Sequence, residues 1–196
     1  MHKKSSGIRA FVSTGLALAS LLTLPLAAQT GAKNGEWPTY GGDLGSTRYS
    51  PLKQVDAANF NKLQVAWRFQ TNNLGPRPEY NLQSTPLMVK GVMYSTAGTR
   101  RAAVAFDAAT GEMLWMHSEN EGARGRNAPR QLSGRGLAYW TDGREERIIY
   151  VTPGYRLIAL NAKTGQLVPT FGKDGVVDLK MDDDQEDRKS TRLNSS

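Results

Sequence analysis

The sequence predicts an all-β fold built from four-stranded antiparallel units that follow one another along the chain. Short apolar runs separated by turn-forming stretches fill the middle of the chain, where long helical periods do not occur. The same order of runs and turns then occurs a second time, farther along the chain. Four-stranded units in tandem are typical of a β-propeller, because each sheet buries its faces against the neighbouring sheets.

Composition excludes several classes of site. The chain has 196 residues, no cysteine and two histidines. Without thiols it cannot build disulfides, thiolate zinc sites or iron–sulfur centres, and two histidines leave little for a His-rich metal site or a Ser–His relay. The net charge of +7 comes mostly from the two ends: residues 1–28 carry three positive charges and residues 187–196 a net two, which leaves +2 for residues 29–186. So small an excess predicts no nucleic-acid partner.

Residues 1–28 are predicted to be a secretory signal peptide. Lys3, Lys4 and Arg9 precede an apolar stretch over residues 10–24, and small residues follow it. The apolar part is short for a bilayer of about 30 Å, so a cleaved leader is favoured over a transmembrane anchor. We therefore expect export to the periplasm of a Gram-negative-type cell.

The other end of the chain, residues 187–196, resembles one reading frame of a common sequencing adapter. This resemblance predicts that these residues are not native and that the chain is an N-terminal fragment, interrupted near Glu186. A polar disordered tail is the alternative, which the composition equally permits.

Residues 29–62 are predicted to be a linker and an opening segment, in which residues 55–63 offer a helical turn or two. A strand is predicted next, over residues 63–69. The prediction rests on an alternation with a period of two, formed by Val65, Trp67 and Phe69.

The first four-stranded unit is predicted over residues 82–118, as two hairpins with turns at residues 90–91 and 107–111. In the longer turn, Asp107 can fold its carboxylate back onto the loop amides. Gly111 can adopt the positive φ that closes the turn. These two residue types in this order therefore predict a tight, self-bonded loop.

The second unit, over residues 134–171, repeats this order, with turns at residues 142–143 and 161–165 and a last strand over residues 166–168. The longer loops of the two units superpose at a constant offset of 54 residues. This offset aligns Ala105 with Ala159, Asp107 with Asn161, Thr110 with Thr164 and Gly111 with Gly165.

At these positions the chain resembles a known family. The pattern Ala105-x-Asp107-x-x-Thr110-Gly111-x-x-x-Trp115 is similar to the tryptophan-docking motif of the pyrroloquinoline quinone (PQQ) dehydrogenases. The resemblance implies an eight-bladed propeller, in which the Trp of one blade packs on the Ala and Gly region of the next blade and its indole N–H reaches a backbone carbonyl. The second copy keeps Ala159, Thr164 and Gly165, but Pro169 stands where the Trp would be. Residues 63–67 resemble the strand that completes the last blade.

The resemblance also implies two cofactor-binding residues. Arg135 matches the family arginine that pairs with a PQQ carboxylate, and a solvated loop arginine is the alternative. Gln83 falls where the family places a Glu or Gln against the quinone edge, and a turn residue is the alternative. Alcohol-oxidising members have adjacent cysteines where this chain has Pro129 and Arg130, and the membrane glucose type has a histidine at the position of Gln131. The chain therefore matches neither subtype.

The function implied by the resemblance is oxidation of an alcohol or a sugar in the periplasm, by hydride transfer to PQQ held by Ca²⁺. Electrons would then pass to a respiratory acceptor, a quinone or cytochrome c. In the family the catalytic base and the calcium ligands belong to later blades, so the fragment alone is expected to be inactive. A non-catalytic propeller that scaffolds protein assembly at the outer membrane is the alternative.

Five arginines and one histidine complete the list of candidates. With a core charge near zero, the arginines are expected at the surface or at a pocket rim, and His117 is expected to end a strand. The arginines are Arg100, Arg101, Arg124, Arg126 and Arg130.

Overall fold

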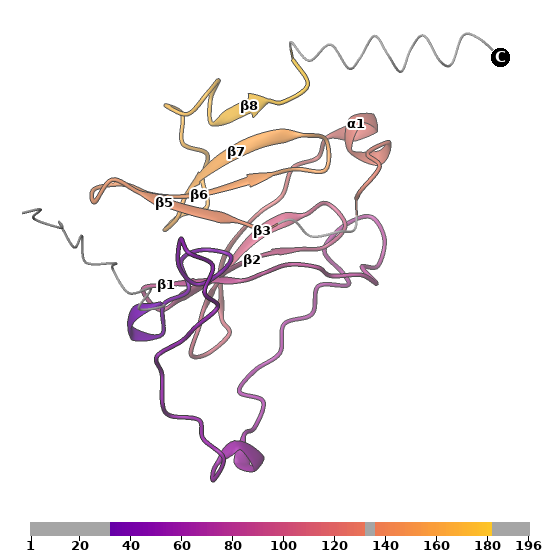
Figure 1. Cartoon of the computed structure of the whole chain (residues 1–196). Coiled ribbons are helices and arrows are strands. Elements are labelled where there is room, and N and C mark those ends of the chain that lie inside the picture. Colours follow the sequence, from indigo (N-terminus) through magenta and orange to yellow (C-terminus); the bar gives the residue numbers. More distant parts are fainter. Residues whose placement is uncertain (1–31, 132–135, 182–196) are drawn as a thin grey trace, which may run out of the picture.

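The computed structural model describes residues 32–131 and 136–181, and these form two four-stranded antiparallel sheets (Figure 1). The first sheet contains β1 (Leu87–Val89), β2 (Val92–Ala97), β3 (Ala102–Asp107) and β4 (Met113–His117). The second contains β5 (Ala138–Thr141), β6 (Glu146–Val151), β7 (Arg156–Asn161) and β8 (Val176–Asp178). In both sheets each strand pairs with the next one in the chain, which confirms the predicted all-β class.

Helical structure is limited to short turns. The described residues contain the 3-10 turns η1 (Lys33–Gly35) and η2 (Phe60–Lys62) and the helix α1 (Gly122–Arg126). The turn η2 lies within the predicted helical stretch and at the far end of the purple segment that reaches away from the sheets in Figure 1. The helix α1 has no signal in the sequence, because two of its five residues are glycines, which are poor helix formers.

The hairpin turns follow from the residues that form them. Lys90 and Gly91 have φ of 51° and 78°, and two consecutive positive φ values are the requirement of the type I′ turn that suits a two-residue hairpin. In the longer loop the Asp107 carboxylate accepts hydrogen bonds from the backbone N–H groups of Ala109 and Thr110, at 3.0 and 2.8 Å. Gly111 has φ of 75°. Both predicted turns of the first sheet are confirmed.

The core lies between the two sheets. One face of each sheet contributes to a single buried apolar cluster, which includes Leu87, Ala103, Ala105, Ile148, Ile158 and Leu160. On the other face of the first sheet, Val104 and Phe106 are buried beneath Phe69 and Leu74. The first sheet is therefore covered on both faces, and the second sheet on the face that it turns toward the first.

Residues 63–69 pair with none of the described segments, so their role in completing another blade stays a prediction. One predicted strand of the second sheet is corrected by the structure. In the second sheet, residues 166–168 contribute only an isolated bridge between Leu160 and Leu167. The ladder stops there because the Ala159 N–H donates to the Gly175 carbonyl at 3.0 Å, and β8 supplies the fourth strand instead.

The predicted signal peptide (residues 1–28) and the predicted non-native tail (residues 187–196) lie outside the described residues. Within the described ranges, none of the helices has the length and apolar character that a membrane span requires.

Candidate functional site

The topology gathers several loops of the two sheets at one end. In an antiparallel meander the first strand begins at the end where the second strand passes to the third. The starts of β1 and β5, the turns at residues 98–101 and 152–155, and the connection that contains α1 therefore share one end of the two sheets, which we call the site end. The loops at residues 107–111 and 161–165 lie at the opposite end.

Gln83 and Arg135 occupy equivalent positions in the chain. The pair Val89–Val92 closes the first hairpin of one sheet and the pair Thr141–Glu146 closes that of the other, so Val89 corresponds to Thr141. Gln83 and Arg135 each precede these residues by six positions. The two residues that the resemblance selects therefore stand at the same distance before the residue that closes the first hairpin of each sheet.

The segment that carries Gln83 is anchored by its neighbour. The Ser84 hydroxyl accepts a hydrogen bond from the Thr96 N–H at 3.2 Å and lies 3.0 Å from the hydroxyls of both Ser95 and Thr96. These bonds hold the segment against β2, while the Gln83 side chain itself is exposed. Arg135 lies outside the described residues.

The docking residues form an interlocked contact between the sheets. The Trp115 indole N–H donates to the Ala162 carbonyl at 2.9 Å, and a Cβ on Gly165 would lie 2.6 Å from the indole ring. Gly165 has φ of 68°, and the Asn161 side chain accepts hydrogen bonds from the N–H groups of Lys163 and Thr164 at 2.9 and 3.1 Å. Only a glycine therefore admits the ring at this contact.

The remaining docking residues shape the strands and loops around this contact. Ala105 and Ala159 are fully buried, on β3 and β7. The Thr110 hydroxyl donates to the Asp107 carboxylate at 3.0 Å and accepts from the Glu112 N–H at 3.2 Å. In the second loop the Thr164 hydroxyl accepts from the Gln166 N–H at 3.4 Å.

Trp67 makes the same kind of contact, which the sequence reasoning missed. Its indole N–H donates to the Ala108 carbonyl at 3.1 Å, and a Cβ on Gly111 would lie 2.5 Å from its ring. Residues 63–69 thus contact the first sheet as β4 contacts the second. The pattern Leu63-x-Val-Ala-Trp67 carried this signal, because it places a Trp at the end of a strand-like run.

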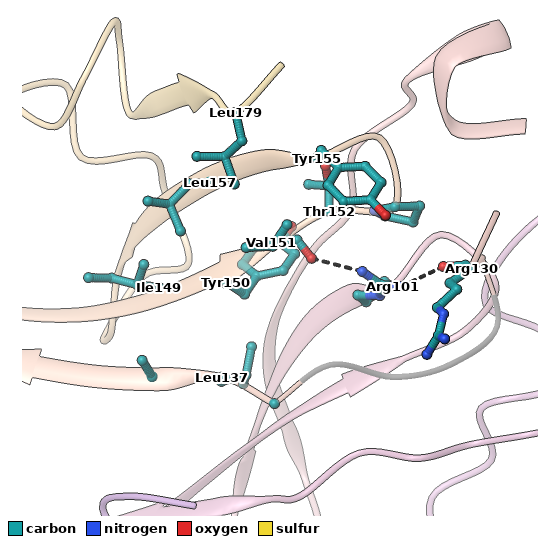
Figure 2. A pocket seen from close by; sticks show the side chains of 13 residues that line it. Arg101, Arg130, Leu137, Ile149, Tyr150, Val151, Thr152, Tyr155, Leu157 and Leu179 are labelled. Atoms are coloured by element: carbon teal, nitrogen blue, oxygen red, sulfur yellow. Dashed lines mark hydrogen bonds between the residues drawn. The ribbon is translucent and has the colours of Figure 1, made fainter. Parts of the chain in front are cut away.

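Of the two predicted places for Arg101, the surface and a pocket rim, the structure favours the second, because the residue is buried and lines a cavity. Its side chain lies between the two sheets and is 4% exposed. Nη1 donates to the Val151 carbonyl at 3.1 Å and Nη2 to the Arg130 carbonyl at 2.6 Å (Figure 2). The turn that carries Arg101 faces the end of β6, so the guanidinium exchanges water for these carbonyl groups. The sequence alone does not indicate that this turn packs against the end of β6.

A second set of charged side chains holds the turn after β6. The Glu121 side chain is 2% exposed, and its carboxylate accepts hydrogen bonds from the Thr152 hydroxyl at 2.7 Å and the Gly154 N–H at 2.6 Å. Arg124 donates to the Gly154 carbonyl and, through both Nη groups, to the Asp178 carboxylate. This hydrogen bonding by Arg124 holds the pKa of Asp178 well below its usual range. Arg124 is therefore an inter-element anchor, not a surface residue.

A cavity of about 600 Å³ opens beside these anchors at the site end (Figure 2). Its walls are mostly apolar, from Ile149, Val151, Leu157 and Leu179, and Arg101, Arg130 and Gly136 line it as well. The Tyr150 side chain packs in the core between the sheets, where its hydroxyl is buried and has no hydrogen-bond partner among the described residues. Burial raises the pKa of Tyr150 far above its ordinary value, so the hydroxyl stays a donor.

Comparison with known proteins gives the family. The β-propeller domain model of the PQQ glucose/ethanol/alcohol dehydrogenases matches residues 37–196, and the chain belongs to this family. Among curated proteins, the chain is 37% identical over 159 residues to the dehydrogenase subunit of the quinone alcohol dehydrogenase of Gluconobacter oxydans, covering 79% of this chain and 18% of that protein. It is 31% identical over 170 residues to the quinoprotein glucose dehydrogenase of Escherichia coli, covering 80% and 21%.

The structure has corresponding neighbours. The crystal structure of the quinohemoprotein alcohol dehydrogenase of Comamonas testosteroni superposes with a TM-score of 0.56 and 32% sequence identity, over 70% of this chain and 19% of that chain. The chain thus carries part of a β-propeller and spans about a fifth of the length of the relatives that it matches.

This cavity does not correspond to the PQQ site that the resemblance implies. Its apolar walls alternate along β6 and β7 with residues of the core between the sheets, so they belong to the face that the second sheet turns away from the first, which a further blade of a propeller would cover. The Tyr150 hydroxyl is buried and presents no accessible donor to it. Gln83 is not among the lining residues, so the described structure does not bring it to this cavity.

The expected calcium ion finds no ligand set in the part of the chain that the structure describes. No group of three or more His, Asp or Glu side chains there could hold a metal ion.

Proposed function

We propose that the chain is the N-terminal part of an exported PQQ-dependent dehydrogenase that oxidises alcohols or sugars and passes the electrons to a quinone or cytochrome c. The observation that carries this proposal is the equivalence of Gln83 and Arg135, each of which stands six positions before the residue that closes the first hairpin of its sheet. A propeller that only scaffolds other proteins has no need of an amide and a guanidinium at the same repeated position.

This stretch of chain contributes binding and orientation. PQQ, when bound, supplies a quinone that accepts a hydride from the substrate. Arg135 would pair with a PQQ carboxylate, which a guanidinium fork holds through two parallel hydrogen bonds. The Gln83 amide would donate to the quinone edge. The metal ligands and the catalytic base belong, in this proposal, to later blades.

The experiment that tests the proposal begins with the complete gene, read through the junction between Glu186 and Asp187. Its product is exported, purified without cofactor and loaded with PQQ and Ca²⁺. Dye reduction is then measured with ethanol, glycerol and glucose in parallel, so that the substrate class is decided by the same assay. We expect PQQ-dependent reduction with at least one of them, and no reduction by residues 29–186 alone.

The scaffold alternative is favoured by one observation. Pro129 and Arg130 stand where alcohol-oxidising relatives place the cysteines that cover one face of PQQ. If the complete product folds and binds no PQQ at any concentration tested, the scaffold function replaces the enzyme.

A further inference from the structure

Three exposed arginines at the site end have no role in the proposed function. We call Arg77, Arg100 and Arg126 the arginine rim. Arg100 lies in the turn between β2 and β3, and Arg126 is the last residue of α1. Both line a hollow of about 120 Å³. Gln131 lines it too, and its side-chain carbonyl accepts a hydrogen bond from Arg77 at 2.7 Å. The three guanidinium groups therefore lie around the same hollow.

The carboxylates near the rim are already engaged within the protein. Glu119 and Glu121 line the hollow as well, but Glu119 lies 2.8 Å from Nε2 of His117, and the side chain of Glu121 is only 2% exposed. Glu79 accepts a backbone N–H at 2.8 Å, and Asp178 pairs with an arginine of α1. These acidic groups are therefore committed to holding the loops of the site end together.

The arginines of the rim have no such partners. Among the described residues, the Arg100 and Arg126 side chains form no hydrogen bond or ion pair, and Arg77 bonds the neutral amide of Gln131. Exposed positive charges that gather around a hollow raise the local concentration of anions. A guanidinium group also matches a carboxylate, to which it can donate two parallel hydrogen bonds. The rim therefore has the chemistry to attract a molecule that carries several carboxylates.

The rim lies beside the residue that the proposed function assigns to the quinone edge. Ser84, the neighbour of Gln83, is bonded to Thr96 near the end of β2, and the turn that follows carries Arg100. The Gln83 side chain is exposed at this same end. A ligand that reaches Gln83 from solvent therefore passes through the field of the rim.

We propose, on the basis of the function above, that the arginine rim captures PQQ from solution through its carboxylates and so speeds its entry. The alcohols and sugars of the proposed reaction are neutral, so the rim does not attract them. Charges at a rim act mainly on the rate of association, whereas contacts in a final binding site act mainly on the rate of dissociation. The proposal therefore concerns how fast PQQ binds, not how tightly it is held once bound.

The test measures the rates at which PQQ binds to and leaves the complete, cofactor-free protein, in the presence of Ca²⁺, by stopped-flow quenching of tryptophan fluorescence. The rim variant combines Arg100→Gln with Arg126→Gln. The matched control combines Arg144→Gln with Lys163→Gln, at exposed positions on the opposite end of the sheets. Both variants have the same net charge, so a difference between them reports where the charge was removed.

At about 10 mM salt, where the Debye length is about 30 Å, we expect the rim variant to bind PQQ about tenfold more slowly than wild type. The control should bind at nearly the wild-type rate. At about 1 M salt, where the Debye length is about 3 Å, all three proteins should bind at the same rate. Their dissociation rates should be equal at both salt concentrations.

Three results would overturn the capture role and leave the proposed function standing. One is an equal association rate for the rim variant and the control at low salt. Another is a wild-type association rate that does not change with salt. The third is faster dissociation of the rim variant with unchanged association, which would assign the arginines to the final binding site. If wild type binds no PQQ, both proposals fail.

Discussion

The Trp67 indole N–H donates to the Ala108 carbonyl at 3.1 Å, across 41 residues of chain. The Trp115 indole repeats this bond on the Ala162 carbonyl at 2.9 Å. The acceptors are 54 residues apart, as are Gly111 and Gly165, on which the two rings lie. Residues 63–69 therefore place a Trp against the first sheet in the same way as β4 places a Trp against the second. They do so although they pair with none of the described strands. This relationship supports their proposed role in completing another blade.

The contact between the Trp115 ring and Gly165 predicts that Gly165→Ala strongly destabilises the protein. The new Cβ would lie 2.6 Å from the Trp115 ring, at φ of 68°. The backbone strain costs about 1 kcal/mol and the displaced ring about 2 kcal/mol more, measured as a loss in the free energy of unfolding in urea.

Gly143→Ala is the matched control for this variant. Gly143 has φ of 89°, but nothing lies within 4 Å of the added Cβ. It should lose only about 1 kcal/mol from backbone strain. Equal losses in the two variants would show that the contact with Trp115 contributes nothing.

The indole hydrogen bond predicts that Trp115→Phe destabilises the protein by about 1–2 kcal/mol, from the lost bond and the smaller ring. The Ala162 carbonyl keeps a second donor, the Tyr94 hydroxyl at 3.3 Å, which limits the loss. Urea unfolding followed by circular dichroism measures it. Trp140→Phe, at a largely exposed position, should change the stability by less than about 0.5 kcal/mol, and an equal effect there would refute the bond's contribution.

The Arg124–Asp178 ion pair predicts an acid-sensitive contribution to stability. The pKa of Asp178 is lowered from its ordinary 3.8, first by hydrogen bonding to Arg124. A lowered folded-state pKa stabilises the fold above the unfolded pKa, and this stabilisation is lost as the pH falls below about 3.8 toward the folded pKa.

Asp178→Asn should therefore flatten the pH dependence of unfolding below pH 4, while Asp174→Asn, in the exposed turn before β8, should leave it unchanged. The measurement is the urea midpoint at a series of pH values. If the urea midpoint changes with pH in the same way in wild type and Asp178→Asn, the role of the ion pair is contradicted.

Tyr94 predicts an alkaline limit of stability. Burial raises the pKa of its hydroxyl from 10.0 to about 12. A raised folded-state pKa stabilises the fold fully below pH 10, and the stabilisation is lost as the pH rises from 10 to about 12. Tyr94→Phe should reduce the loss of stability over this range, whereas Tyr80→Phe, at an exposed position, should not. Phenolate absorbance during alkaline titration, together with the urea midpoint, decides between them.

The parts of the fold that sequence predicts are local. Lys90, Gly91 and Asp107 determine their turns through their own φ angles and side-chain bonds, so the hairpins are visible in the sequence. The fourth strand of the second sheet is not local, because it depends on where the chain returns to β7. Residues 166–168 have the composition of a strand, but the Ala159 N–H bonds to the Gly175 carbonyl and so does not continue the ladder with them.

In the candidate site, too, some features can be read in the sequence and others depend on packing. The spacing of Gln83 and Arg135 from their strands can be read in the sequence once the two hairpin turns are aligned, because the turns differ by two residues. The burial of Arg101 and Glu121 cannot be read in the sequence, because it depends on which surfaces of the two sheets meet. A charged residue in a turn is solvated in most proteins, and only the packing of two sheets distinguishes these two from the exposed Arg100.

The most direct test of the central claim is an equilibrium titration of PQQ, with Ca²⁺ present, into the cofactor-free product of the complete gene, with the bound quinone counted after separation from the free. Saturable binding is the predicted result, weakened about tenfold or more by Arg135→Gln and to a smaller degree by Gln83→Ala. A folded product that shows no saturable binding, or binding that Arg135→Gln leaves unchanged, would contradict the assignment of this end of the propeller as a quinone site.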